Sequence, residues 1–273
     1  MIDYTAIDNS PELMSFVFYQ RKGVDDCPPF ASDLLIKVDG DIAVSCRFYS
    51  QDLDNPWILY FHGNGEIVSD YDTIALFYLQ MKLNLVVADY RGYGISSGTP
   101  SLMNILKDSH LIFSGVRDEL ARRGYAKKPW LMGRSLGSLS ALELAASHPG
   151  EIQGIIVESG FMSIVPILRH LFLPLPPDEG SLERIEKEAW EQTGRISLPA
   201  LVIHGESDVL VPLQEARNLY EALKSPDKRI LIIPNADHNT VIFAHPHLYF
   251  GMIAEFVGRT GEPEREDCSS LLR

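Results

Sequence analysis

The pentapeptide Gly133-Arg134-Ser135-Leu136-Gly137 places a hydroxyl side chain between two glycines. It follows an apolar run at 129–132 that is typical of a strand, and it precedes a stretch with helical spacing. Small residues on both sides let the backbone turn sharply, so that the serine hydroxyl projects above the end of the strand. This context predicts that Ser135 is a nucleophile; the alternative is a purely structural turn.

A serine hydroxyl reacts poorly unless a base removes its proton, and histidine is the usual base. Of the eight histidines, His238 follows the last apolar run, in the loop before the last expected helix. His62 opens a glycine-rich loop and His204 lies within a strand, so both are expected to be structural. His245 and His247 flank a proline, but no carboxylate or cysteine completes a ligand set, and we expect no metal site. The sequence favours His238 as the base.

The imidazole needs a carboxylate that fixes its tautomer and stabilises its charged form. Asp208 closes the run "VIHGESD", one strand and one helix before His238. Glu158, at the end of the strand that follows the Ser135 helix, is the second candidate. Asp237 adjoins the histidine and Asp89 precedes a tight turn, which makes both less suitable. We expect Asp208 to complete a Ser–His–Asp triad.

These residues require a scaffold that brings successive strand ends together. Short apolar runs alternate with helical stretches, and two alternating runs surround Asp39-Gly40-Asp41 in a hairpin pattern. Apolar runs separated by helices indicate parallel strands buried on both faces. The predicted fold class is α/β, with a mostly parallel central sheet, helices on both faces and an antiparallel hairpin at the N-terminal edge. The strands are expected within 33–50, 57–65, 83–94, 129–133, 153–159, 199–208 and 228–238, and the helices near 66–83, 102–123, after Ser135, 212–224 and 240–257.

Residues 161–197 interrupt this alternation, because they contain four prolines, no strand pattern and one amphipathic run at 181–192. An excursion between two parallel strands usually lies above their carboxyl ends, so this segment is predicted to form a small helical cap. Its apolar side chains are expected to line a substrate pocket, although they could serve only to attach the cap. The candidate substrate-binding residues are Phe161, Met162, Leu168 and Phe172. The remaining organisation is an N-terminal extension at 1–30 packed on the core, a catalytic domain at 31–258 and a polar C-terminal tail at 259–273.

Five motifs in this order give the chain a recognisable resemblance. "HGNG", "DYRGYGISSG", "GRSLG", "HGESDVLVP" and "DH" stand at successive strand ends, and the likeness covers about residues 31–258. The chain resembles the alpha/beta-hydrolase superfamily, and within it the small-cap branch that includes protein depalmitoylases and related uncharacterised hydrolases. The resemblance implies that the backbone N–H groups of Asn64 and Leu136 form an oxyanion hole.

The leading functional prediction is a serine hydrolase that cleaves a carboxylic ester, thioester or amide through an acyl-enzyme on Ser135. The same triad could transfer the acyl group to an alcohol, which would make the protein an acyltransferase. A third possibility is a hydrolase fold without activity that serves as a binding protein. None of these readings requires a cofactor.

Composition restricts the partners further. The 273 residues are 45% hydrophobic and carry a formal net charge of −13, which disfavours nucleic acid and anionic lipid surfaces. The N-terminal residues show no signal-peptide pattern, and no segment reaches the length of a membrane span. Three widely spaced cysteines indicate reduced thiols rather than disulfides. We therefore expect a cytoplasmic enzyme without a membrane anchor that acts on a small-molecule or acylated substrate; its oligomeric state cannot be read from the sequence.

Overall fold

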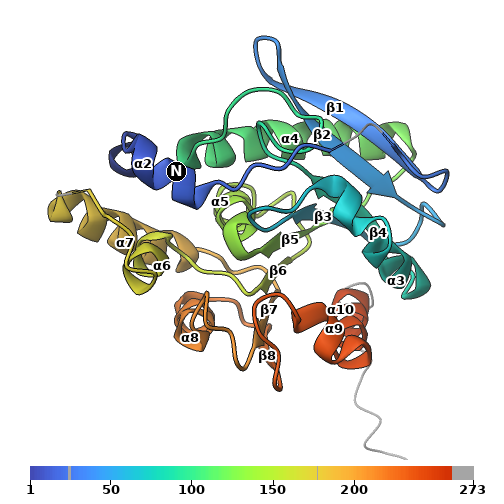
Figure 1. Ribbon diagram of the computed structural model, residues 1–273. Coiled ribbons are helices and arrows are strands. Elements are labelled where there is room, and N and C mark those ends of the chain that lie inside the picture. Colours follow the sequence, from blue (N-terminus) through green and yellow to red (C-terminus); the bar gives the residue numbers. More distant parts are fainter. Residues whose placement is uncertain (24–25, 177, 260–273) are drawn as a thin grey trace, which may run out of the picture.

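One eight-stranded sheet organises the molecule (Figure 1). The computed structural model describes residues 1–23, 26–176 and 178–259, so the predicted tail at 259–273 lies, apart from Arg259, outside the described residues. The strands are β1 (Ala31–Asp39), β2 (Ile42–Tyr49), β3 (Trp57–Phe61), β4 (Asn84–Ala88), β5 (Trp130–Arg134), β6 (Ile155–Glu158), β7 (Ala200–Gly205) and β8 (Lys228–Ile233). Their order across the sheet is β1-β2-β4-β3-β5-β6-β7-β8.

The direction of the strands confirms the predicted fold class. β1 pairs with β2 and β2 with β4 in antiparallel fashion, whereas all pairs from β4 to β8 are parallel. The carboxyl ends of β3 to β8 therefore meet at one edge of the sheet. The register places Gly133 of β5 beside Phe61 of β3 and Val157 of β6, which brings the loops after these strands together.

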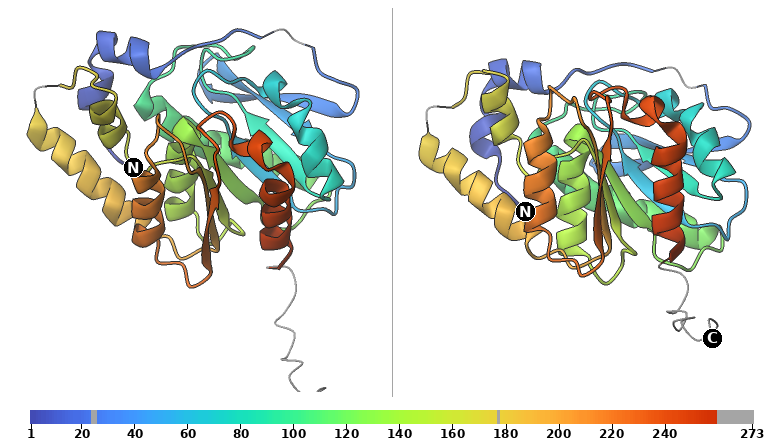
Figure 2. Two further views of the ribbon diagram at one scale, coloured as in Figure 1. Left: turned by 60° about the horizontal axis from the view of Figure 1, so that its bottom comes forward. Right: turned by 90° about the horizontal axis from the view of Figure 1, so that it is seen from below.

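Helices cover both faces of the sheet (Figure 2). The central strands have buried side chains on both faces, because each face packs against a separate apolar cluster. One face carries α4 (Leu102–Arg122), α5 (Ser138–Ser147) and α8 (Leu213–Ala222). The other carries η1 (Val68–Tyr71), α3 (Ile74–Gln80), α9 (Val241–Ala244) and α10 (Pro246–Arg259).

Two predicted helices are each divided in the structure. The stretch expected near 66–83 forms the 3-10 helix η1 followed by α3, and the stretch near 240–257 forms α9 and α10. His245 separates the latter pair with φ −142° and ψ 70°, because the residue before a proline is disfavoured in helical conformation.

The N-terminal residues pack on the core through two short helices, α1 (Thr5–Asp8) and α2 (Pro11–Val17). Ile7 and Leu13 are fully buried. The Asp8 carboxylate accepts hydrogen bonds from the backbone N–H groups of Leu102 and Met103, which would otherwise be unpaired at the start of α4. The extension is thus connected to the first turn of a core helix.

The segment between β6 and β7 contains α6 (Val165–His170) and α7 (Glu179–Thr193). The amphipathic run predicted at 181–192 lies within α7, which packs against α5, α6 and α8. We refer to residues 161–197 as the cap. Within the described ranges, no helix has the length and apolar character needed to cross a membrane.

Candidate active site

Ser135 stands at a sharp turn between β5 and a 3-10 turn, η2 (Ser135–Gly137), that leads into α5. Its φ of 50° is a left-handed conformation that side-chain-bearing residues rarely adopt. Steric constraints require glycine at the two flanking positions, 133 and 137. A Cβ on Gly133 would lie 2.5 Å from the carbonyl oxygen of Gly137, and a Cβ on Gly137 would overlap the carbonyl oxygen of Phe61. The tight turn therefore excludes larger residues on both sides of the serine.

The structure brings Ser135, His238 and Asp208 into one chain of hydrogen bonds. The Oγ of Ser135 lies 3.0 Å from Nε2 of His238, and Nδ1 of the same ring lies 2.8 Å from Oδ2 of Asp208. Loops after β5, β7 and β8 supply these residues, although 103 positions separate the serine from the histidine. This arrangement can transfer a proton from the serine hydroxyl to the ring, with the carboxylate orienting the opposite nitrogen.

The loop after β7 holds Asp208 as an oriented carboxylate. Its Oδ1 accepts hydrogen bonds from the N–H groups of Leu210 and Val211, at 3.0 and 2.9 Å. Burial by itself raises the pKa of Asp208, but the hydrogen bond and charge of His238, together with the Val211 N–H, outweigh it and hold the pKa below its usual value. His204 lies beneath this loop and bonds through Nε2 to the Val211 carbonyl. Burial lowers the pKa of His204, which favours the neutral form of this ring.

Glu158, the second candidate for the acid, contacts other groups. Its Oε2 accepts hydrogen bonds from the hydroxyls of Tyr249 and Tyr60, at 2.5 and 3.3 Å. It ends β6 and, like Ile156 two positions before it, faces the side of the sheet that packs against α10. Because side chains alternate along a strand, Glu158 is turned away from the acid position that Asp208 occupies.

The two expected oxyanion residues both lie beside Ser135, in the wall of one apolar cavity. Leu136 follows the serine, and Asn64 comes from the loop after β3. The Asn64 side-chain oxygen accepts hydrogen bonds from the Tyr19 N–H and the Tyr93 hydroxyl, at 2.8 and 2.7 Å. These bonds fix the loop whose backbone N–H was predicted to face the reacting carbonyl.

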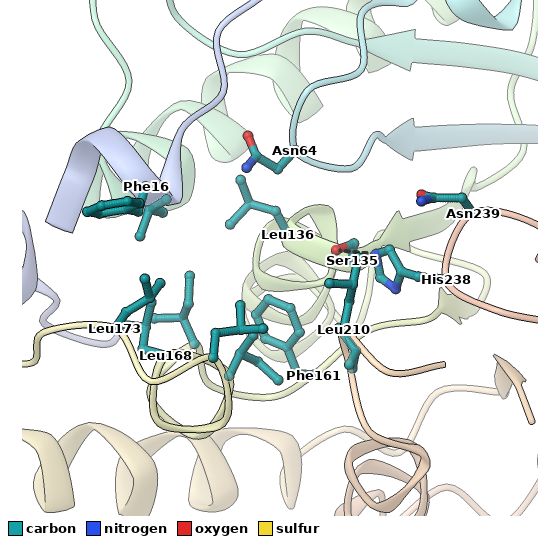
Figure 3. A pocket seen from close by; sticks show the side chains of 15 residues that line it. Phe16, Asn64, Ser135, Leu136, Phe161, Leu168, Leu173, Leu210, His238 and Asn239 are labelled. Atoms are coloured by element: carbon teal, nitrogen blue, oxygen red, sulfur yellow. Dashed lines mark hydrogen bonds between the residues drawn. The ribbon is translucent and has the colours of Figure 1, made fainter. Parts of the chain in front are cut away.

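The apolar cavity has a volume of about 280 Å³ and extends from Ser135 toward the cap and α2 (Figure 3). Ser135 and His238 lie at one end, Phe16, Leu168 and Leu173 surround the other, and Phe161 lies between them. Its lining consists of Phe16, Val17, Asn64, Ser135, Leu136, Phe161, Ile164, Ile167, Leu168, Leu171, Leu173, Leu210, Val211, His238 and Asn239.

Two of the four predicted substrate-binding residues line this cavity and two do not. Phe161 and Leu168 are part of its wall. Phe172 has φ 55° and a side chain that is 95% exposed, because the chain reverses direction directly after α6. Met162 is buried on another side of the cap, beside Trp190 of α7. The prediction that Met162 and Phe172 line the pocket is therefore corrected.

Sequence reasoning missed the walls that lie outside the cap. Phe16 and Val17 come from α2, and Leu210 and Val211 from the loop that carries Asp208. The apolar "VLVP" directly after Asp208 was a usable signal. The position of α2 over the cavity had no local signal in the sequence, because it depends on tertiary packing.

A serine at a strand–turn–helix junction, an acid and a histidine at later strand ends, and this strand order define an alpha/beta hydrolase. Comparison with known families agrees. The chain belongs to the family described as "Serine aminopeptidase, S33" (Hydrolase_4), whose sequence model matches residues 55–176 and 181–242.

Individual relatives extend this result. The chain is 31% identical to a Saccharomyces cerevisiae protein named "Uncharacterized membrane protein YNL320W" and 28% identical to lysophosphatidylserine lipase ABHD12 of Rattus norvegicus. These alignments cover 69% and 78% of this chain but only 65% and 58% of the relatives. Among solved structures, the Pyrococcus furiosus esterase Pf2001 superposes with a TM-score of 0.69 at 19% identity, over 88% of this chain and 98% of that one. The last comparison supports the fold.

Proposed function

We propose that this protein is a serine hydrolase that cleaves an ester, thioester or amide of an apolar acyl group through an acyl-enzyme on Ser135. The observation that carries the proposal is the continuous hydrogen-bonded chain from Ser135 through His238 to Asp208. The apolar cavity at the serine supplies room for the acyl chain. The names of two relatives, a lysophosphatidylserine lipase and an esterase, agree with ester substrates.

The geometry supports the following sequence of events. His238 takes the proton of Ser135 Oγ while the oxygen attacks the substrate carbonyl, and the N–H groups of Asn64 and Leu136 stabilise the resulting oxyanion. One such donor typically contributes about 3–4 kcal/mol to transition-state stabilisation. His238 then donates its proton to the leaving group as the bond to it breaks. Water, deprotonated by the same histidine, releases the acid and restores Ser135.

The test combines labelling with turnover. A fluorophosphonate probe should label Ser135, and the protein should hydrolyse p-nitrophenyl octanoate. Ser135→Ala should abolish labelling and lower kcat by at least about a thousandfold, because the nucleophile is lost.

Ser15→Ala is the matched control, since this hydroxyl is exposed and donates a hydrogen bond to the Glu12 carbonyl within its own helix. Ser15→Ala should behave as wild type. Wild-type turnover that survives in Ser135→Ala would contradict the proposal, and added alcohol acceptors would show whether the acyl group passes to water or to an alcohol.

A further inference from the structure

The position of the leaving group is constrained once Ser135 is acylated from the apolar cavity. The leaving-group oxygen must lie within reach of His238 Nε2, because that nitrogen returns the proton. The acyl chain extends toward the cap, so the leaving group has to extend past His238, where Asn239 lies (Figure 3). The groups found on that side therefore determine which leaving group the site can accept.

Asn239 lines both the apolar cavity and a second cavity of about 190 Å³. We call the second one the polar cavity. Two buried ionisable side chains, Arg134 and Glu158, form part of its wall, and Arg134 directly precedes the nucleophile. The described residues that line it are Glu66, Asp70, Tyr71, Ile74, Arg134, Glu158, Asn239, Ile242 and Phe243.

The two buried ionisable side chains of the polar cavity differ in how fully their hydrogen-bonding groups are used. All three Arg134 nitrogens are engaged: Nε with Glu66 at 2.8 Å, Nη1 with the His238 carbonyl at 3.0 Å and Nη2 with Asn239 Oδ1 at 3.5 Å. Glu158 is different. Its side chain is 1% exposed, and its Oε1 accepts no hydrogen bond from the described residues, although it forms an ion pair with Arg134 Nη1 at 3.5 Å. A buried acceptor without a hydrogen bond is costly, so an occupant that donates a hydrogen bond to Oε1 would be stabilised here.

The charges and the aromatic side chains of the polar cavity also favour a positively charged occupant. Three carboxylates line the cavity, namely Glu66, Asp70 and Glu158, against the single guanidinium of Arg134. Arg21 pairs with Asp70 but is not part of the lining. Tyr71 and Phe243 add aromatic surface, which attracts cations. Among the described residues that line the cavity, an anionic group would meet carboxylates and a guanidinium whose nitrogens are all engaged.

From these observations we infer that the polar cavity is a subsite for the leaving group of the substrate. It selects amino alcohols, whose amine carries a positive charge, and rejects anionic leaving groups. This inference rests on the proposed hydrolase function and specifies its substrate class. Because the selecting groups lie beyond Asn239, they act on the leaving group and not on the acyl chain.

The experiment uses octanoate esters that differ only in the alcohol. The 2-(dimethylamino)ethyl ester carries a protonated amine at pH 7, and the 3-methylbutyl ester is its neutral isostere. A 2-sulfoethyl ester supplies an anionic alcohol and a glyceryl ester an uncharged hydroxylated one. Each kcat/KM is divided by the rate of hydrolysis by hydroxide, which removes differences in intrinsic reactivity. The ammonium ester should exceed its isostere by about five- to tenfold, as expected for a partly desolvated cation beside carboxylates and aromatic rings.

Variants assign this preference to the cavity. Glu158→Gln and Asp70→Asn remove charge with little change in shape, and each should lower the ammonium-to-isostere ratio at least about threefold. Glu183→Gln makes the same chemical change on an exposed turn of α7 and should leave the ratio unchanged. Asp70 lies at the rim, so Asp70→Asn remains informative if the buried Glu158 variant does not fold.

Failure of this inference and failure of the proposed function give different results. If all esters are hydrolysed but the ratio is near one, or is the same in both cavity variants and the control, the inference is wrong and the hydrolase proposal stands. Preference for the sulfoethyl or glyceryl ester also overturns it. If no ester is hydrolysed, the affinities of Ser135→Ala for the ammonium ester and for its isostere are measured by calorimetry. Equal affinities would contradict the proposed subsite.

Discussion

Asp208 and Glu158 are both buried carboxylates close to the carboxyl ends of the strands, yet their surroundings suit different tasks. Asp208 accepts hydrogen bonds from two backbone N–H groups and from the His238 ring, and its pKa lies below the usual value. Burial raises the pKa of Glu158, despite the opposing charge of Arg134. An acid that must remain ionised beside an imidazolium is better provided by the first environment.

Replacing Asp208 by Asn should lower kcat by about a thousand- to ten-thousandfold, because an amide can hold His238 in the wrong tautomer and cannot stabilise its charge. Glu158→Gln should have a much smaller effect on kcat for p-nitrophenyl octanoate. Both variants keep the side-chain volume, so near-wild-type melting temperatures would show that the fold is intact. A nearly silent Asp208→Asn together with a crippled Glu158→Gln would reverse the assignment.

Sequence order was sufficient to select the three hydrogen-bonded residues Ser135, Asp208 and His238, because each follows an apolar strand pattern. Parallel strands share a direction, so positions after them are neighbours whatever their separation along the chain. Met162 and Phe172 had no such constraint. In a short segment with four prolines, the direction of each side chain depends on where helices begin and end, which periodicity does not specify.

At the scale of elements, α6 supplies one wall of the apolar cavity, and its C-terminal end offers a matched pair of residues. Leu171 lines the cavity, whereas its neighbour Phe172 is 95% exposed and does not. Comparing an alanine substitution at each position therefore distinguishes a contribution to acyl-chain specificity from a general effect of removing a large side chain from the cap.

Leu171→Ala should shift the preferred acyl chain toward longer substrates by about one or two carbons, since each methylene buried in an apolar site is worth about 0.8 kcal/mol, roughly fourfold in kcat/KM. Phe172→Ala should leave the profile unchanged. The measurement is kcat/KM for esters of two- to twelve-carbon acids. Parallel profiles for Leu171→Ala and wild type would show that the acyl chain does not reach α6.

Element boundaries were predicted less accurately than the existence of the elements. The apolar runs of β3 to β7 are buried on both faces and can be recognised without context. The divisions between η1 and α3, and between α9 and α10, depend on local backbone preferences that an apolar pattern does not record. Both divided segments contribute residues to the wall of the polar cavity.

For the whole molecule, the N-terminal extension contributes to both stability and the site. Leu13 is fully buried in the main apolar cluster, whereas Phe16, three positions later on α2, is 56% exposed and faces the cavity. A single short helix thus carries one residue for the core and one for the substrate.

Leu13→Ala should destabilise the protein by about 2–5 kcal/mol, as large-to-small substitutions in cores do, and lower the melting temperature by about 5–15 °C. Phe16→Ala should change the melting temperature little but reduce kcat/KM for long acyl chains. Thermal denaturation and the acyl-chain series measure the two effects. Equal losses of stability in both variants would place Phe16 in the core rather than in the substrate site.

The separation of 103 positions between the nucleophile and its base has a consequence for protein synthesis. A ribosome completes the Ser135 turn long before it adds Asp208 and His238, and a serine hydroxyl without a base is a weak nucleophile. On the proposed mechanism, metabolites that meet the emerging chain during translation therefore do not acylate Ser135. On the same mechanism, Ser135 is reactive only when β7 and β8 have joined the sheet, so labelling of Ser135 by a fluorophosphonate would report the assembly of these strands.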